Sequence, residues 1–264
     1  MKRSKLFVKI ISVLMVISTL IILYGFNFNS IAFDRGLYKE EFSKYNVYTN
    51  LENYDAEKIN DEVLNYLKNG KNNNIIENDF FNEREKQHLL DVRNLVQGVL
   101  SIYYFSITLF LLSTIILFLL MNFNFRGISR RLLVILAFGS LLAFLGAGLA
   151  YLPSSLNFDF AFDAFHKTFF SPGTYLFNPE FENIVVLYPE NLFLDLLFRI
   201  IFSIIFSSGM LFFISATLFF IFFKQNFPNF PKNFPSRKEK NKSFKYYFRN
   251  KLNLNFRNLS KTKK

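Results

Sequence analysis

Residues 99–121 read VLSIYYFSITLFLLSTIILFLLM and carry no charged side chain. A helix needs ~20 apolar residues to cross a bilayer core of about 30 Å, and this stretch is long enough. Three further apolar blocks occur at residues 6–26, 132–152 and 196–223, and only Lys9 and Arg199 are charged within them. Lipid offers no hydrogen-bond partners, so the N–H and C=O groups of each block must bond to one another within the segment. All four blocks therefore predict membrane-spanning helices.

The composition agrees with a membrane protein. Of the 264 residues, 51% are hydrophobic and only 19% are charged, against roughly 25% charged in soluble domains. The clustering of the apolar residues in four blocks excludes a soluble globule, a disordered chain and a collagen-like fibre. Cysteine is absent, which excludes a disulfide framework, a thiolate zinc site and a cysteine nucleophile.

The charges between the blocks predict the orientation. The segments 27–97 and 153–195 hold 19 of the 20 acidic residues, whereas the short link 122–131 holds three arginines and no acid. Positive loops stay in the cytoplasm, so we expect both termini and the link there, in a multi-pass protein of the cell membrane. The predicted fold is an all-α membrane protein with four transmembrane helices, 6–26, 99–121, 132–152 and 196–223. The loops 27–97 and 153–195 would form a small extracytoplasmic cap.

The net charge of +11 comes from the last segment, 224–264, which holds 13 Lys or Arg residues and one acid. A basic stretch directly after a span is typical of contact with anionic lipid headgroups, which makes membrane phospholipid an expected partner. A solvated tail that only sets the orientation is the alternative. No fold motif for nucleic-acid binding accompanies the charge, so no nucleic-acid partner is expected, and the oligomeric state is left open.

The first outward segment contains signals for two helices. Asp55 is a suitable N-cap for a helix over 56–69, and Gly70 fits the position after its end. Asn82 predicts the start of a second helix, with Glu85 at the reciprocal position of a capping box. No helix breaker separates this second helix from the span at 99–121, so we expect one continuous helix.

The second outward segment opens with Pro153. A short helix is expected over DFAFDAFHKTFF, residues 159–170, and Ser171-Pro172-Gly173 would end it. Pro189 fits the first turn of a helix that continues into the last span. In the third block, Gly139, Ala143 and Ala147 have the small-residue spacing that predicts close helix packing.

The chain has only two histidines, His88 and His166, one in each outward segment. Glu85 and Asp91 share a helix face with His88, and Asp163 lies one turn from His166. A neighbouring carboxylate fixes the tautomer of an imidazole, and imidazole is the usual group for moving protons near neutral pH. These residues predict a catalytic pair, although two ordinary structural histidines remain the alternative.

Two other functional classes stay open. Two histidines and a carboxylate are a possible zinc or iron set, which would suit a metal-dependent membrane hydrolase, but no HExxH motif is present. A non-enzymatic assembly or permease module is the second class, and the scarcity of charge within the spans argues against transport. Arg93 and Arg199 each either extend to the membrane surface or face the bundle and bind a carbonyl group.

The segments EREKQHLLDVRNL (83–95), FHKTFF (165–170) and LYPENLFLD (187–195), in this order on four spans, resemble the bacterial lipoprotein intramolecular transacylase family. LNYL at 64–67 also fits. In that family two outward-facing histidines are catalytic, and the matching positions are His88 and His166. One departure is visible: a Trp is expected shortly after FHKTFF, and this chain has Tyr175 as the nearest aromatic residue.

The resemblance implies an acyl transfer on a diacylglyceryl lipoprotein. The sn-2 acyl chain would move to the α-amino group of the N-terminal Cys of that substrate, which gives a lyso-form lipoprotein, and no cofactor or metal is implied. His166 is the expected base and His88 the second proton-handling or oxyanion-binding group, or the reverse. Asp91 and Asp163 are the expected orienting groups, while Glu85, Arg93 and Arg199 are further supporting candidates.

Overall fold

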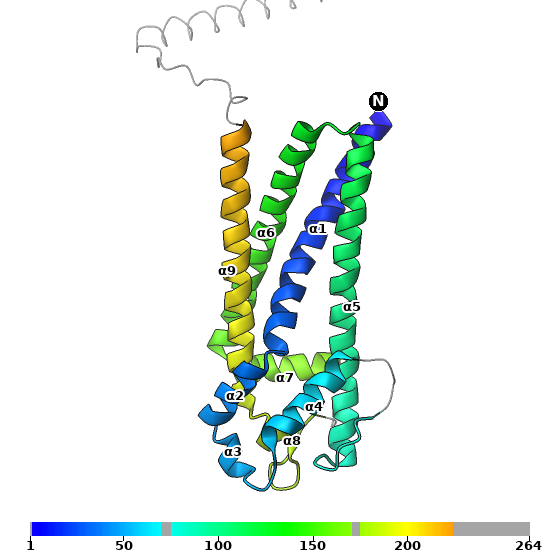
Figure 1. The fold of residues 1–264 in the computed structure, drawn as a ribbon. Coiled ribbons are helices and arrows are strands. Elements are labelled where there is room, and N and C mark those ends of the chain that lie inside the picture. The colour runs from blue at the N-terminus through cyan, green and yellow to red at the C-terminus, as the bar shows by residue number, and fades with distance from the viewer. Residues whose placement is uncertain (1, 70–74, 171–174, 224–264) are drawn as a thin grey trace, which may run out of the picture. The chain divides into compact units, whose positions relative to one another are not determined.

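The structure is a computed structural model that describes residues 2–69, 75–170 and 175–223. Within these ranges every regular element is a helix (Figure 1). In chain order the helices are α1 (Lys2–Ala32), α2 (Arg35–Lys44), α3 (Val47–Asn50), α4 (Ala56–Lys68), α5 (Glu83–Leu120), α6 (Phe125–Leu156), α7 (Phe158–Phe169), α8 (Ile184–Leu187) and α9 (Glu190–Phe223).

Four of the helices, α1, α5, α6 and α9, are long and apolar enough to cross a membrane, and they run alongside one another in Figure 1. The predicted all-α fold with four spans is therefore confirmed. At about 1.5 Å per residue, the 38 residues of α5 are longer than the bilayer core requires. The charged residues of α5 all lie in its first turns, before the uncharged stretch 99–121 that the sequence predicts as the span.

Small residues let the long helices approach closely. Gly139 of α6 faces α1, where a Cβ atom added to it would lie 2.6 Å from Cβ of Thr19. Ala143 and Ala147 on the same face of α6 are fully buried. The close packing predicted from this spacing is confirmed. Gly25 of α1 fits in the same way against the ring of Tyr103 in α5.

The helices α2, α3, α4 and α8 lie together at the end of the bundle where α5 begins, with α2 and α3 near the start of α9 and α4 beside the first turns of α5 (Figure 1), and we call this group the cap. Its apolar core includes Phe42, Val47, Val63 and Leu187, each no more than 2% exposed. Because these residues come from four different helices, the cap has a hydrophobic core of its own at one end of the spans.

Local capping signals account for the ends of the cap helices. The Asp55 carboxylate accepts a hydrogen bond from the Lys58 amide (3.0 Å) at the start of α4. At the start of α5, Asn82 and Glu85 form the predicted capping box. α4 ends at Lys68, and Gly70 lies outside the described residues.

The junction after the third span differs from expectation. Pro153, the first residue of the predicted outward segment, lies inside α6, which continues for one more turn to Leu156. A proline lacks the N–H donor and crowds the carbonyl of the preceding turn, but the Pro153 carbonyl still accepts from the Asn157 amide at 3.1 Å. Asn157 then caps α7 by accepting from the amide of Phe160.

Helix α7 crosses the end of the four long helices, next to the cap (Figure 1). The expected terminator Ser171-Pro172-Gly173 lies outside the described residues. After α8, Pro189 stands immediately before α9, and its carbonyl accepts from the Leu192 amide (2.9 Å) in the first turn. Helix α9 then continues without a break into the last span.

Candidate active site

The two histidines meet where α7 passes the first turns of α5. Their ring centroids are 6.4 Å apart and the ring planes differ by 20°. Only 7% of His88 and 8% of His166 is exposed. Two imidazoles that are far apart in the sequence thus form one buried pair, which we call the histidine pair.

The hydrogen bond of His166 defines its tautomer. Nδ1 of His166 lies 2.8 Å from the carbonyl oxygen of Phe162, one helical turn earlier in α7. A carbonyl oxygen only accepts, so Nδ1 carries the proton of the neutral ring. Nε2 of His166 is therefore left with its lone pair, which is the state required of a general base.

Burial lowers the pKa of His166 below its ordinary value, because the charged ring loses hydration. The hydrogen bond to the Phe162 carbonyl and the negative charges of Glu190 and Asp163 act in the opposite direction. Burial is the larger effect, so His166 is mostly neutral at pH 7.

His88 packs against two phenylalanine rings. Its ring centroid is 4.9 Å from that of Phe170 and 5.3 Å from that of Phe177. Burial, together with the neighbouring imidazole of His166 and the positive charge of Arg84, lowers the pKa of His88 to about 4. Its Nδ1 atom is buried without a hydrogen-bond partner among the described residues. His88 is therefore a neutral imidazole with an unused polar atom.

The chain between α7 and α9 is fastened to the start of α5 by Arg84 and Glu85. Arg84 pairs with Glu182 at 2.6 Å, and its guanidinium lies over the ring of Phe177. One oxygen of Glu85 accepts from the amide of Ile184 at 2.6 Å, and the other accepts from the amide of Asn82. These bonds hold Phe177 against His88.

The structure gives the expected orienting residues other partners. Both Glu85 oxygens are used by backbone amides, as described above. Asp163 accepts from Lys167 at 2.6 Å, and the Phe162 carbonyl takes its place at Nδ1 of His166. Asp91 is partly exposed on α5, and no hydrogen bond joins it to His88 within the described part of the chain. Arg93 is buried, with its guanidinium over the ring of Tyr66 in α4.

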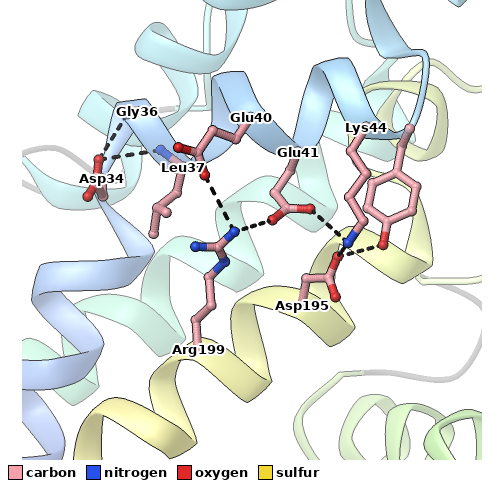
Figure 2. A network of polar contacts seen from close by, with 9 residues as sticks. Asp34, Gly36, Leu37, Glu40, Glu41, Lys44, Asp195 and Arg199 are labelled. Carbon is pink, nitrogen blue, oxygen red and sulfur yellow. Dashed lines mark hydrogen bonds and ion pairs between the residues drawn. The ribbon is translucent and has the colours of Figure 1, made fainter.

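Arg199 belongs to a separate polar network between α2 and α9, shown in Figure 2. It donates to Glu41 (3.1 Å) and Glu40 (3.4 Å). Asp195, one turn earlier in α9, is paired with Lys44 and accepts from the hydroxyl of Tyr45 at 2.6 Å. Arg199 thus faces the cap rather than the histidine pair.

Sequence reasoning missed three features of the site, namely the Phe162 carbonyl, Phe177 and Glu190. The carbonyl has no signal in the sequence beyond the i,i+4 spacing of a helix. Phe177 follows a break in the helical pattern, so its return to α5 could not be read from periodicity. Glu190 lies in the quoted LYPENLFLD segment, but its proximity to His166 depends on how α9 meets α7.

Aromatic side chains enclose His166. The ring centroids of Phe162 and Tyr175 lie 4.0 and 5.0 Å from that of His166, and Phe165 meets it edge-on. Tyr175 thus occupies the wall at which the family resemblance led us to expect a Trp. Within the described ranges, no group of three His, Cys, Asp or Glu side chains is arranged to hold a metal ion.

The fold is that of a multi-pass membrane protein, with a buried histidine pair beside its long helices. The model of the family "Lipoprotein intramolecular transacylase Lit" matches residues 12–193. The chain belongs to this family, which makes it an acyltransferase that acts on lipoproteins.

Solved structures support the fold. The membrane integral lipoprotein intramolecular transacylase Lit from Bacillus cereus aligns with a TM-score of 0.67 at 20% identity, over 83% of this chain and 96% of that chain. A form of that protein with one histidine changed to arginine aligns with a TM-score of 0.64 at 20% identity, over 85% and 98% of the two chains. A comparison with curated proteins gave no match.

Proposed function

We propose that this protein transfers the sn-2 acyl chain of a diacylglyceryl lipoprotein to the α-amino group of the N-terminal Cys of the same molecule. The observation that carries the proposal is the histidine pair, in which His166 has a free Nε2 lone pair and His88 is neutral. An intramolecular acyl shift needs a base for the amine and a donor for the oxyanion, and it needs no acyl carrier.

His166 is the base in this proposal. An α-amino group has a pKa near 8 and arrives mostly protonated at neutral pH. Nε2 of His166 removes one proton, and the amine nitrogen attacks the carbonyl carbon of the sn-2 ester. The new C–N bond forms and the C–O bond to glycerol breaks. Of the two protons that the ammonium nitrogen loses on becoming an amide, one passes from His166 to the glycerol oxygen and the other is released to water. Because amine and ester belong to one substrate, holding them in contact supplies much of the rate.

His88 is the oxyanion donor. A neutral imidazole can donate a hydrogen bond to the developing negative charge without first losing a proton. The positive charge of Arg84 lies on the His88 side of the pair, where it lowers the pKa of His88. Negative charge from Glu190 acts on the His166 side. This polarity favours the oxyanion near His88 and the amine near His166.

The surroundings of the pair suit an acyl chain. Phe165 and Phe169 in α7 are about half exposed beside His166, and their rings contact each other. Exposed aromatic rings at the end of membrane spans are typical of the bilayer interface. We therefore place α7 at the outer membrane surface, where the ester bonds of a lipid anchor lie, with both chain termini and residues 122–131 in the cytoplasm.

The test uses a synthetic diacylglyceryl lipopeptide with a free N-terminal amine and the purified protein in detergent. The product has the same mass as the substrate, so fragmentation by tandem mass spectrometry must locate the acyl chain. We expect it on the amine with wild-type protein. The His166→Ala and His88→Ala variants should lose the conversion, and a conversion that both variants retain would refute the mechanism.

A further inference from the structure

Glu190 is a carboxylate beside the histidine pair that the structure leaves unused. It is the first residue of α9 and is exposed. Within the described part of the chain, its side chain makes no hydrogen bond or ion pair. Such a position has an ordinary structural explanation, because an acid in the first turn of a helix interacts favourably with the helix dipole.

Packing contacts place the start of α9 next to His166. One turn after Glu190, the ring of Phe193 lies 6.3 Å from the ring of Phe162. The Phe162 ring is in turn 4.0 Å from the His166 ring. The charge of Glu190 is close enough to raise the pKa of His166 against the effect of burial. The ring contacts of Phe193 and Phe162 thus put the start of α9 on the His166 side of the pair, and the charge of Glu190 acts on that ring.

The other acid that acts on His166 is already neutralised. Asp163 is paired with Lys167 at 2.6 Å, whereas Glu190 has no cation of its own in the described ranges. The proposed base must take a proton from an amine. An exposed carboxylate on the same side, without a cation of its own, can bind a positively charged ligand there.

We propose that Glu190 binds the α-ammonium group of the lipoprotein substrate and holds it against Nε2 of His166. The inference rests on the proposed function, because it assigns the amine end of that reaction. One ammonium proton moves to Nε2, the freed nitrogen attacks the ester and gives up a second proton to water as the amide forms, and Glu190 stays ionised throughout. Its role is to bind and position the amine, and the proton transfers belong to His166.

The test compares binding of two lipopeptides, one with a free N-terminal amine and one in which a hydrogen replaces the amino group. Wild-type protein should bind the amine form about fivefold more tightly, as expected for a partly exposed charge pair. Glu190→Gln should abolish this preference, and Glu190→Asp should retain most of it. With the reactive lipopeptide, Glu190→Gln should raise KM more than it lowers kcat.

Glu83→Gln is the matched control, because Glu83 is an exposed acid in the first turn of α5. It should leave the amine preference unchanged. If Glu190→Gln does not fold, Glu190→Ser supplies a residue suited to a helix start and repeats the measurement. An amine preference that survives loss of the carboxylate would overturn the role of Glu190 alone. Wild-type protein that fails to convert the lipopeptide would instead refute the proposed function.

Discussion

His166 is held by a backbone atom rather than by a carboxylate, and this determines which substitution tests it best. In His166→Asn the shorter side chain can still place an amide N–H near the Phe162 carbonyl, but it has no counterpart of Nε2. We expect the variant to fold and to lose about 10²–10⁴-fold in kcat, the range of general-base catalysis. Thr168→Ala, an exposed change in the same helix, should retain activity. Equal activity of His166→Asn and wild type would exclude His166 as the base.

The low pKa of His88 predicts how stability depends on pH. The folded protein has a pKa of about 4 at His88, against 6.5 for an ordinary histidine. Between these values the unfolded chain binds a proton that the folded chain does not, so stability falls as the pH drops from 6.5 towards 4. The slope from this one group is at most about 1.4 kcal/mol per pH unit. His88→Gln lacks this contribution.

Thermal unfolding in detergent at pH 7 and pH 5 measures the effect. Wild-type protein should lose more stability between the two pH values than His88→Gln does. The same loss in both proteins would show that His88 is not held neutral by its surroundings. Because the chain has only two histidines, NMR titration of labelled histidine gives a direct second measurement of both pKa values.

At the scale of single residues, the sequence predicted the contacts that form within one helical turn. The Asp55 cap and the capping box of Asn82 and Glu85 depend on spacings of three residues, and both are present. The same spacing suggested that Asp163 would orient His166, but Lys167 at i+4 competes for that carboxylate. The bond from the Ile184 amide to Glu85 spans 99 residues, and no local pattern contains it.

At the scale of elements, the network in Figure 2 fastens α2 of the cap to α9, and its two central carboxylates differ. Burial and the neighbouring Asp195 raise the pKa of Glu41. For Asp195, burial acts to raise the pKa, but hydrogen bonds from Lys44 and Tyr45 outweigh it, and the pKa is lowered. Asp195 is therefore the carboxylate whose negative charge the network stabilises.

This difference predicts unequal effects of neutral substitutions. Asp195→Asn removes the charge that Lys44 and Tyr45 bind and should destabilise the protein by about 2 kcal/mol, the range for hydrogen bonds to a charged group. Glu41→Gln keeps an acceptor for Arg199 and should cost less. Melting temperatures of the two variants in the same detergent test the order. A greater loss in Glu41→Gln would mean that Glu41 carries the essential charge.

Element boundaries were predictable where charge or capping marks them and less so where apolar sequence continues. The start of α5 at Glu83 follows from its capping box. The third apolar block ends at 152, but α6 continues past Pro153 to Leu156, where the proline removes one backbone hydrogen bond in the last turn. Helix α7 was predicted almost in full, over 159–170 against the observed Phe158–Phe169.

For the whole molecule, hydropathy alone predicted the four spans, because nothing but a helix satisfies an isolated apolar segment in lipid. The charges of the loops predicted only that His88 and His166 lie on the same side of the membrane, and they did not predict that the two rings meet. The actual contact depends on α7 crossing the end of the bundle (Figure 1). It also depends on the residues after α7 returning to Arg84 and Glu85.

The predicted orientation is open to a direct test, because the chain has no cysteine that would give background labelling. Ser43 in α2 of the cap and Ser129 near the start of α6 are both exposed, and Ser→Cys is nearly isosteric. In intact cells, a membrane-impermeant maleimide should label Ser43→Cys and leave Ser129→Cys unlabelled, because the arginines around Ser129 belong on the cytoplasmic side. After permeabilisation both should react.

The reverse labelling pattern would place the histidine pair in the cytoplasm, where the amine and ester of a lipoprotein anchored in the outer leaflet cannot reach it. Labelling of neither site before permeabilisation would show that the cap is shielded, and Glu180→Cys, in the exposed turn before α8, then provides a second position. The orientation matters to the chemistry because the acyl shift requires the cap, the exposed phenylalanines of α7 and the substrate on one side of the membrane.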